Sequence, residues 1–260
     1  MTSPTPSPTT TLAVANQKGG VAKTTSVASL GAALAELGHS VLLVDLDPQA
    51  CLTFSVGIDP EDLDLSVHNV LVREKQAADV LLHTDEGPDL IPATIELAAA
   101  ETKLLTKTGR EHAVRVALED LAPAYDWVLL DCPPSLGVLT VGALSAADEV
   151  LIPLQCETLS HRGVGQLLDT VHDVRELINP RLSVLGVLPT LYDGRTNHAK
   201  AVIETIGETY DLPVLGPPIP KSVRFAEAPA IGRSILGTSR THRGAEAYRA
   251  VARSLLDRHG

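Results

Sequence analysis

One short segment constrains the fold of this chain more than any other. The apolar run Leu12–Ala15 leads into the loop Asn16–Thr25, which carries the pattern K-G-G-x-x-K-T and is followed by apolar residues at helical spacing. Glycines let backbone N–H groups curl around an anion, and the N-terminus of the following helix adds partial positive charge. The order strand, loop, helix therefore predicts a phosphate-binding loop on a βα unit.

Two lysines and a threonine give this loop its chemistry. Lys23 is placed to reach the β- and γ-phosphates of a nucleotide, and the Thr24 hydroxyl to ligate Mg²⁺. The ordinary pattern G-x-x-x-x-G-K-[ST] is not met, because Gln17 and Ala22 stand where it has glycine. A second lysine, Lys18, stands at the head of the loop instead.

Apolar runs alternate with helical patterns along the rest of the chain. Near-continuous runs of this kind are typical of strands buried on both faces of a parallel sheet. Strands are predicted at Leu12–Ala15, Val41–Val44, Val128–Leu130, Val150–Ile152 and Leu182–Leu188. Helices are predicted at 24–37, ending at Gly38, and near 94–105, 110–122, 160–178, 196–209 and 244–257. The alternation predicts an α/β fold: a single doubly wound, mainly parallel sheet with helices on both faces.

No repeat or linker divides the chain, so one domain is expected over residues 12–260. Residues 1–11 are uncharged and rich in Pro, Ser and Thr, which predicts a disordered tail. Segment 57–90, with many acidic residues and two prolines, is expected to be a loop-rich excursion at the edge of the fold.

Composition excludes several classes of protein. Aromatic residues make up only 3%, which argues against a module that reads bases with stacked rings. No apolar run approaches the roughly 20 residues of a membrane span, and the N-terminus lacks the features of a secretory signal. The 3 cysteines are far apart, so neither a disulfide framework nor a C-x-x-C metal site is expected. A cytoplasmic protein is the expectation.

Charge is distributed unevenly. The formal net charge is −11, but residues 1–180 hold 10 basic and 25 acidic residues, whereas residues 181–260 hold 11 basic and 7 acidic ones. The basic C-terminal third permits a local face for a polyanion, although solvated charges on ordinary helices explain the same pattern.

Four segments in order resemble the deviant Walker A ATPases of the ParA/MinD family. They are the loop Asn16–Thr25, the strand Val41–Gln49 with Asp45 and Asp47, the segment Trp127–Ser135 with Asp131, and the segment Lys221–Pro229. The last segment resembles one peculiar to the ParA/Soj branch, which partitions chromosomes or plasmids. The resemblance covers roughly residues 12–255.

The resemblance implies a slow, Mg²⁺-dependent ATPase whose homodimer forms around ATP. Asp47 is expected to orient the attacking water, Lys23 to hold phosphates, and Lys18 to reach the partner's ATP as a further catalytic group. Mg²⁺ is expected at Thr24 and, through water, at Asp131. Residues expected at the nucleotide are Lys18, Gly19, Gly20, Val21, Ala22, Lys23, Thr24, Thr25, Asp45 and Pro220.

The family also implies binding of DNA without sequence preference, and hence association with the nucleoid. Residues expected to contact DNA are Arg195, Lys221, Arg224 and Arg233. A ParB-like activator is a possible further partner, and no membrane partner is expected. Plain alternatives stay open: turn formation for Asp45 and Asp47, a solvated lysine for Lys18, and a cap or an ion pair for Arg195 and Arg224.

The predicted function is therefore an ATP-dependent dimerising ATPase that binds DNA and segregates DNA or positions a cargo. Two alternatives remain: an orphan positioning or regulatory ATPase without a ParB-type partner, and a small-molecule ATP-dependent enzyme on the same fold. Two departures from the family pattern are expected to matter. Ala22 replaces the usual glycine, and a Cβ costs about 1–2 kcal/mol if φ is positive there; Arg162 replaces a frequent acid.

Overall fold

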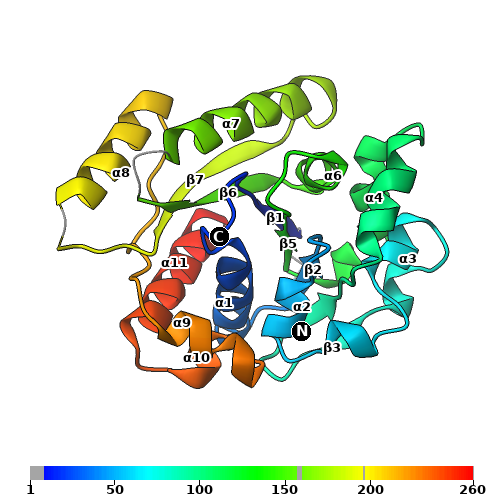
Figure 1. The fold of residues 1–260 in the computed structure, drawn as a ribbon, viewed down its shortest axis with the longest axis horizontal. Coiled ribbons are helices and arrows are strands. Elements are labelled where there is room, and N and C mark those ends of the chain that lie inside the picture. The colour runs from blue at the N-terminus through cyan, green and yellow to red at the C-terminus, as the bar shows by residue number, and fades with distance from the viewer. Residues whose placement is uncertain (1–8, 157–159, 196, 260) are drawn as a thin grey trace, which may run out of the picture.

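A seven-stranded sheet lies between two layers of helices (Figure 1). The computed structural model describes residues 9–156, 160–195 and 197–259. The strand order is β3-β4-β2-β5-β1-β6-β7, and every neighbouring pair is parallel except β3 with β4. The strands are β1 (Thr10–Val14), β2 (Val41–Asp45), β3 (Leu82–His83), β4 (Asp89–Ile91), β5 (Trp127–Asp131), β6 (Glu149–Gln155) and β7 (Ser183–Thr190).

The helices follow the strands in the alternating order of a doubly wound fold. Those of eight residues or more are α1 (Lys23–Glu36), α4 (Leu97–Leu105), α6 (Val138–Ala146), α7 (Ser160–Leu177), α8 (Asn197–Tyr210) and α11 (Arg243–His259). Shorter ones are α2 (Cys51–Ser55), α3 (Val67–Leu71), α5 (Ala113–Leu118), α9 (Arg224–Glu227) and α10 (Ile235–Thr238). The predicted fold class is confirmed.

The sheet is buried on both faces, which explains why its strands have continuous apolar sequences. In β2, Leu42 and Val44 belong to one buried cluster, which helices α3 to α8 cover, while Val41 and Leu43 belong to the other, which α1, α10 and α11 cover. Because successive side chains of a strand point to opposite faces, a strand with two buried faces has no polar positions to alternate.

Three expectations need correction. β1 begins at Thr10, so the expected tail over residues 1–11 ends too late: the β-branched Thr10 and Thr11 pair with Trp127 and Val128. Residues 1–8 lie outside the described part. Segment 57–90 lies at the edge of the sheet, as expected. It is more regular than predicted, because it holds α3, β3 and the start of β4. The pairing of β4 with β2 was not predicted. Helix α6 was also missed, because it is apolar nearly all round and has no amphipathic pattern.

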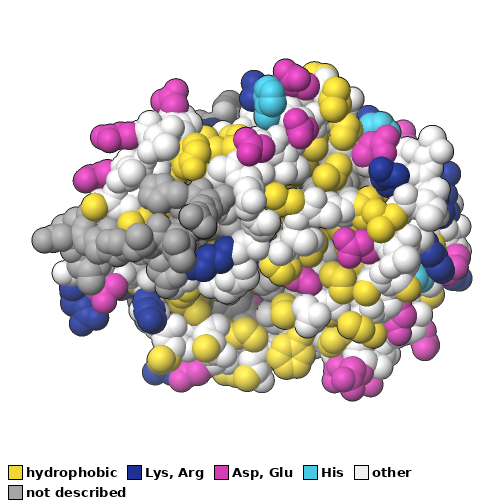
Figure 2. Space-filling model, turned by 45° about the horizontal axis from the view of Figure 1, so that its top comes forward, with side chains coloured by type: hydrophobic (Ala, Val, Ile, Leu, Met, Phe, Trp, Pro, Cys, Tyr) yellow, Lys and Arg dark blue, Asp and Glu magenta, His cyan; other side chains and the backbone are white. Residues whose placement is uncertain are grey.

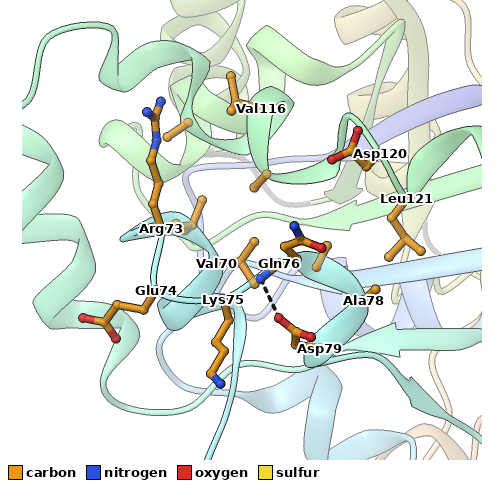
Figure 3. A pocket seen from close by; sticks show the side chains of 14 residues that line it. Val70, Arg73, Glu74, Lys75, Gln76, Ala78, Asp79, Val116, Asp120 and Leu121 are labelled. Carbon is orange, nitrogen blue, oxygen red and sulfur yellow. Dashed lines mark hydrogen bonds between the residues drawn. The ribbon is translucent and has the colours of Figure 1, made fainter.

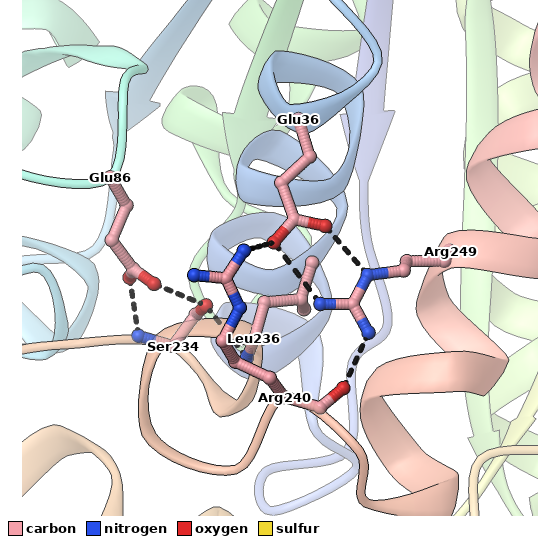
Figure 4. A network of polar contacts seen from close by, with 6 residues as sticks. All are labelled: Glu36, Glu86, Ser234, Leu236, Arg240 and Arg249. Carbon is pink, nitrogen blue, oxygen red and sulfur yellow. Dashed lines mark hydrogen bonds and ion pairs between the residues drawn. The ribbon is translucent and has the colours of Figure 1, made fainter.

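An ion-pair network ties the C-terminal segment to the first helix (Figure 4). Glu36 on α1 accepts hydrogen bonds from Arg249 Nε (2.6 Å) and Nη2 (3.1 Å), and Arg240 lies 3.7 Å from the same carboxylate. Glu86, beside β4, accepts hydrogen bonds from the backbone N–H and the hydroxyl of Ser234. The loop that carries α10 is therefore anchored at two points.

One face of the C-terminal helix packs against the rest of the fold. The apolar face of α11, including Tyr248, Val251 and Leu255, is buried, and the Tyr248 hydroxyl lies 3.0 Å from the Ser26 hydroxyl of α1. Figure 1 shows α1 and α11 side by side. Within the described ranges, no helix combines the length and apolar character that crossing a bilayer requires.

Candidate functional site

The functional site lies at the carboxyl edge of the three central strands. The phosphate loop follows β1, and the last residues of β2 and β5, Asp45 and Asp131, are register partners. Open α/β sheets bind ligands in the crevice outside the carboxyl ends of their strands. Thr24 and Asp131, which are 107 residues apart in the sequence, therefore meet at one place.

A cavity of about 740 Å³ opens beside the phosphate loop. Its walls come from the loop, from the β2–α2 connection and α2, and from the segment around α9. The lining residues are Gly19, Gly20, Ala22, Lys23, Thr24, Thr25, Asp47, Gln49, Cys51, Phe54, Ser55, Pro60, Pro134, Leu191, Ser222, Phe225, Ala226 and Pro229. A cavity of this size, part polar and part apolar, suits a nucleotide.

The loop is held in shape by its own polar contacts. The Asn16 side chain accepts a hydrogen bond from the Lys18 N–H (3.0 Å) and donates one to the Pro153 carbonyl (2.8 Å). Lys23 Nζ donates to the Lys18 carbonyl (3.3 Å), and the Thr190 hydroxyl donates to the Val21 carbonyl (2.9 Å). The glycine-containing turn is therefore anchored to both β6 and β7.

Thr24 and Asp131 meet as expected of a magnesium site. The Thr24 hydroxyl donates to Asp131 Oδ2 (2.7 Å), while Asp131 Oδ1 is buried and has no hydrogen-bond partner. Among the described side chains, no cluster of three or more His, Cys, Asp or Glu could hold a metal. Mg²⁺ rarely needs such a cage, since it binds through one or two protein groups, water and the substrate's phosphates. The residues present fit a nucleotide-bound Mg²⁺.

Burial sets the protonation of the groups around this point. Burial, followed by repulsion from Asp45, raises the pKa of Asp131 well above its usual value, against the opposing effects of Thr24 and Lys23. Burial also lowers the pKa of Lys23, although Asp131 opposes the shift. A divalent cation at Asp131 would offset the repulsion between the two carboxylates.

Asp45 and Asp47 have different surroundings. Asp47 lines the cavity, and its Oδ1 also accepts a hydrogen bond from the Gln49 N–H (2.9 Å), which is the alternative turn-forming contact. Asp45 is fully buried and does not belong to the cavity lining, and its role at the nucleotide stays a prediction. Its Oδ2 accepts hydrogen bonds from Thr53 N–H (2.9 Å) and hydroxyl (2.8 Å), and its Oδ1 accepts one from the Asp47 N–H (3.1 Å).

Three other expected nucleotide residues lie outside the described cavity lining. Lys18 stands at the entrance of the loop, Val21 is buried and directs its carbonyl to Thr190, and Pro220 pairs with Tyr192. The lining also includes residues that the sequence did not predict, notably Phe54 of α2 and Ser222 and Phe225 near α9. The segment containing Ser222 and Phe225 was singled out by resemblance, but nothing in its composition indicated a wall of this cavity.

Three of the four residues expected to contact DNA form ion pairs with acids. Arg195 is paired with Asp193 (2.9 Å), Arg224 with Glu227 (2.8 Å) and Arg233 with Asp85 (3.3 Å). The fold brings Lys221 beside the Arg195 loop, because the Lys221 N–H donates to the Tyr192 carbonyl (3.1 Å). The ion pairs anticipated as an alternative for the arginines are thus present. The side chain of Arg162 lies outside the described ones.

Three of the five non-glycine residues with left-handed backbone in the described part of the chain lie at the site. Ala22 (φ 65°) and Leu191 (φ 49°) line the cavity, and Ala50 (φ 52°) lies between two lining residues. Such conformations are costly for residues with a Cβ and persist only where the surrounding structure enforces them. The departure at Ala22 is therefore a strained position, as expected if its φ were positive.

A second cavity of about 700 Å³ lies away from the phosphate loop, between α3 and α5 (Figure 3). Its rim carries charges of both signs, from Arg73, Glu74 and Lys75, and Asp79 accepts a hydrogen bond from the Gln76 N–H. It has no phosphate-binding turn, so the cavity at the loop is the candidate site.

Fold and site together define a P-loop nucleotide-binding protein, and comparison with known proteins agrees. The family model described as "AAA domain" matches residues 9–184. Soj, the sporulation initiation inhibitor of Bacillus subtilis, is 44% identical over 245 residues, which cover 94% of this chain and 97% of that protein. The chromosome partitioning protein ParA of Caulobacter vibrioides is 40% identical over 254 residues, covering 96% and 95%. The chain belongs to the ParA/Soj family of partitioning ATPases, and the resemblance drawn from its motifs is confirmed.

Solved structures of related proteins have the same fold as this chain. A Mycobacterium smegmatis protein described as cobyrinic acid a,c-diamide synthase, with a bound ATP analogue and magnesium, is 54% identical with a TM-score of 0.86. The match covers 95% of this chain and 94% of that one. The expected cofactors, ATP and Mg²⁺, correspond to what that structure holds. A complex of a Cyanothece McdA variant with ATP has a TM-score of 0.87 at 24% identity, with coverage of 97% and 98%, and supports the fold.

The strain at Ala22 can be measured. Ala22→Gly should raise the free energy of unfolding by about 1 kcal/mol, because glycine adopts positive φ without a Cβ penalty. Urea denaturation of the nucleotide-free protein checks this. As a matched control, Ala99→Gly on the exposed side of α4 should lower the same quantity by about 1 kcal/mol, because glycine is a poor helix former. A lower stability for Ala22→Gly would contradict the strain.

Proposed function

We propose that the protein is an ATP-driven switch: Mg²⁺-ATP in the cavity holds two copies together, and the dimer binds DNA without sequence preference. Hydrolysis, slow and assisted by Asp47, then releases both partners. Such a protein segregates DNA or positions a cargo in the cytoplasm, on the nucleoid, and a ParB-like activator would set its timing. Family membership and the geometry of the loop support the ATPase part.

One observation supports the proposal that nucleotide binding controls DNA binding. Ser222, Phe225 and Ala226 line the nucleotide cavity, and the exposed Lys221 and Arg224 belong to the same short segment. A nucleotide that contacts the inner side of this segment can therefore set the position of the cations on it. Dimerisation would double the number of phosphate contacts and raise avidity without new chemistry.

The acids paired with the arginines affect how strongly the proposed DNA-binding residues can bind phosphate. The Arg195 side chain is 90% exposed and its partner Asp193 is 38% exposed, so the pair contributes little to stability and can exchange for phosphate. Figure 2 shows, on the face in view, basic and acidic side chains lying next to one another rather than in separate fields. With a net charge of −11, the chain should bind DNA weakly as a monomer and only at low salt.

The DNA proposal is tested by fluorescence anisotropy with a duplex of arbitrary sequence at low salt. The parent protein should bind with ATP and not with ADP. Arg195→Glu/Arg224→Glu should lose at least about tenfold in affinity, and Asp193→Asn should gain about twofold to fivefold, because it frees Arg195 from its pair. Lys107→Glu/Arg115→Glu, an equal change of charge at two other exposed residues, serves as the control and should bind like the parent. Absence of ATP-dependent binding by the parent would refute DNA binding.

The proposed contact of Lys18 with the ATP of the partner subunit has a separate test. Lys18→Ala should bind ATP yet remain a monomer in sedimentation velocity with ATP, because the contact to the partner's nucleotide is lost. Lys23→Ala, the control within the same loop, should fail to bind ATP at all, since Lys23 lines the cavity and is expected to hold the phosphates. If Lys18→Ala forms the ATP dimer and hydrolyses ATP like the parent, Lys18 does not act on the partner's ATP.

The second candidate function is ATP-dependent amide synthesis, favoured by the 54% identity to the M. smegmatis protein. Glutamine-dependent amidation needs a reactive thiolate to release ammonia. Burial raises the pKa of Cys132 strongly and that of Cys156 to about 11, and burial with nearby Asp47 raises that of Cys51. The pKa of none of the three cysteines is lowered, and the chain is 44% identical to Soj, so the switch is the better-supported proposal. Formation of an amide from cobyrinic acid, glutamine and Mg²⁺-ATP, followed by mass spectrometry, would reverse this choice.

A further inference from the structure

A buried threonine joins three elements below the nucleotide cavity. Thr53 of α2 is fully buried. Its hydroxyl donates to Asp45 Oδ2 (2.8 Å) and accepts a hydrogen bond from the Ala93 N–H (2.9 Å), which follows β4. Its own N–H donates to the same carboxylate oxygen (2.9 Å). One side chain thus connects the end of β2, the helix α2 and the chain beyond β4.

The contact continues to the cavity. The other oxygen of Asp45 accepts a hydrogen bond from the Asp47 N–H (3.1 Å), and Asp47 lines the cavity. The backbone at Asp47 is therefore held by Asp45, and Asp45 is held by Thr53. Three hydrogen bonds to one fully buried carboxylate leave it little freedom, because losing any of them would leave a polar group unpaired away from water.

The same short helix faces the nucleotide on its other side. Cys51, Phe54 and Ser55 of α2 line the cavity, while Thr53 points inward to Asp45. The Thr53 N–H bond to Asp45 remains when only the hydroxyl is removed, so α2 keeps its place in the cavity wall while Asp45, and with it Asp47, loses part of its support. No other described contact of Asp45 with a side-chain hydroxyl is present to replace Thr53.

We propose that Thr53 is a positioning residue for ATP hydrolysis, which acts through Asp45 to hold Asp47 at the angle that its catalytic role requires. The inference rests on the proposed role of Asp47. The phosphate loop is formed by other contacts, from Asn16 and Thr190, so nucleotide binding does not depend on Thr53. Losing the Thr53 hydroxyl therefore affects the rate of hydrolysis and leaves ATP affinity in place.

The test compares variants that remove or keep the hydroxyl. Thr53→Val keeps the shape and should lower kcat for Mg²⁺-ATP about tenfold, with KM within about twofold, because a small misplacement of a catalytic group costs rate rather than binding. Thr53→Ser keeps the hydroxyl and should restore kcat to within about threefold of the parent. If Thr53→Val does not fold, Thr53→Ala provides the same comparison.

A nearby threonine is the matched control. Thr94 is also buried, and its hydroxyl lies 3.1 Å from that of Ser66, with no contact to Asp45. Thr94→Val should lower the melting temperature and leave kcat unchanged. If Thr94→Val lowers kcat as much as Thr53→Val, or if Thr53→Val turns over like the parent, Thr53 has only a structural role.

Asp47→Ala separates this inference from the proposal on which it rests. Slow hydrolysis by Asp47→Ala together with normal hydrolysis by Thr53→Val would refute the positioning role alone. Hydrolysis at the parent rate by Asp47→Ala would refute the catalytic role of Asp47, and the role of Thr53 with it.

Discussion

The structure depends on the burial of two carboxylates at the ends of adjacent strands. Asp45 and Asp131 are register partners, and both are fully inaccessible to solvent. A buried charge is costly unless it is paired and hydrogen-bonded, so the surrounding residues must supply partners. Thr53 and the Asp47 backbone provide them for Asp45, and Thr24 and Lys23 do so for Asp131. The other oxygen of Asp131, Oδ1, is buried and has no hydrogen-bond partner in the protein. A nucleotide-bound cation would supply that partner.

The cavity is completed by the last third of the chain. The segment that includes α9 forms its outer wall, and that segment is anchored through the loop after it to α1 and to the turn before β4 (Figure 4). These anchors are ion pairs and hydrogen bonds near the surface, which are weaker than buried apolar contacts. The wall is thus held by contacts that can exchange, which is consistent with the proposal that a nucleotide sets its position.

Sequence alone predicted those parts of the molecule whose signals are local. Continuous apolar runs located the five long strands, and the spacing of the glycines and lysines located the phosphate loop. β3 and β4 have two and three residues, too few for any periodicity, and α6 is buried on all sides and so has no polar face. Thr53 could not be predicted either, because its partners Asp45 and Ala93 are 8 and 40 residues away and only the fold brings them together. The acids beside Arg195 and Arg224 are close in sequence, and there the ion-pair alternative was foreseeable.

The central claim is that Asp131 and Thr24 form a magnesium site that needs a nucleotide to be complete. Thermal unfolding with saturating ADP, with and without Mg²⁺, tests it most directly, since a ligand stabilises the state that binds it. Mg²⁺ should raise the melting temperature of the parent protein only when ADP is present. Asp131→Asn should lose this increment, and Asp120→Asn, which alters an exposed aspartate that lines the other cavity, should keep it. An equal Mg²⁺ increment in the parent protein and in Asp131→Asn would contradict the account.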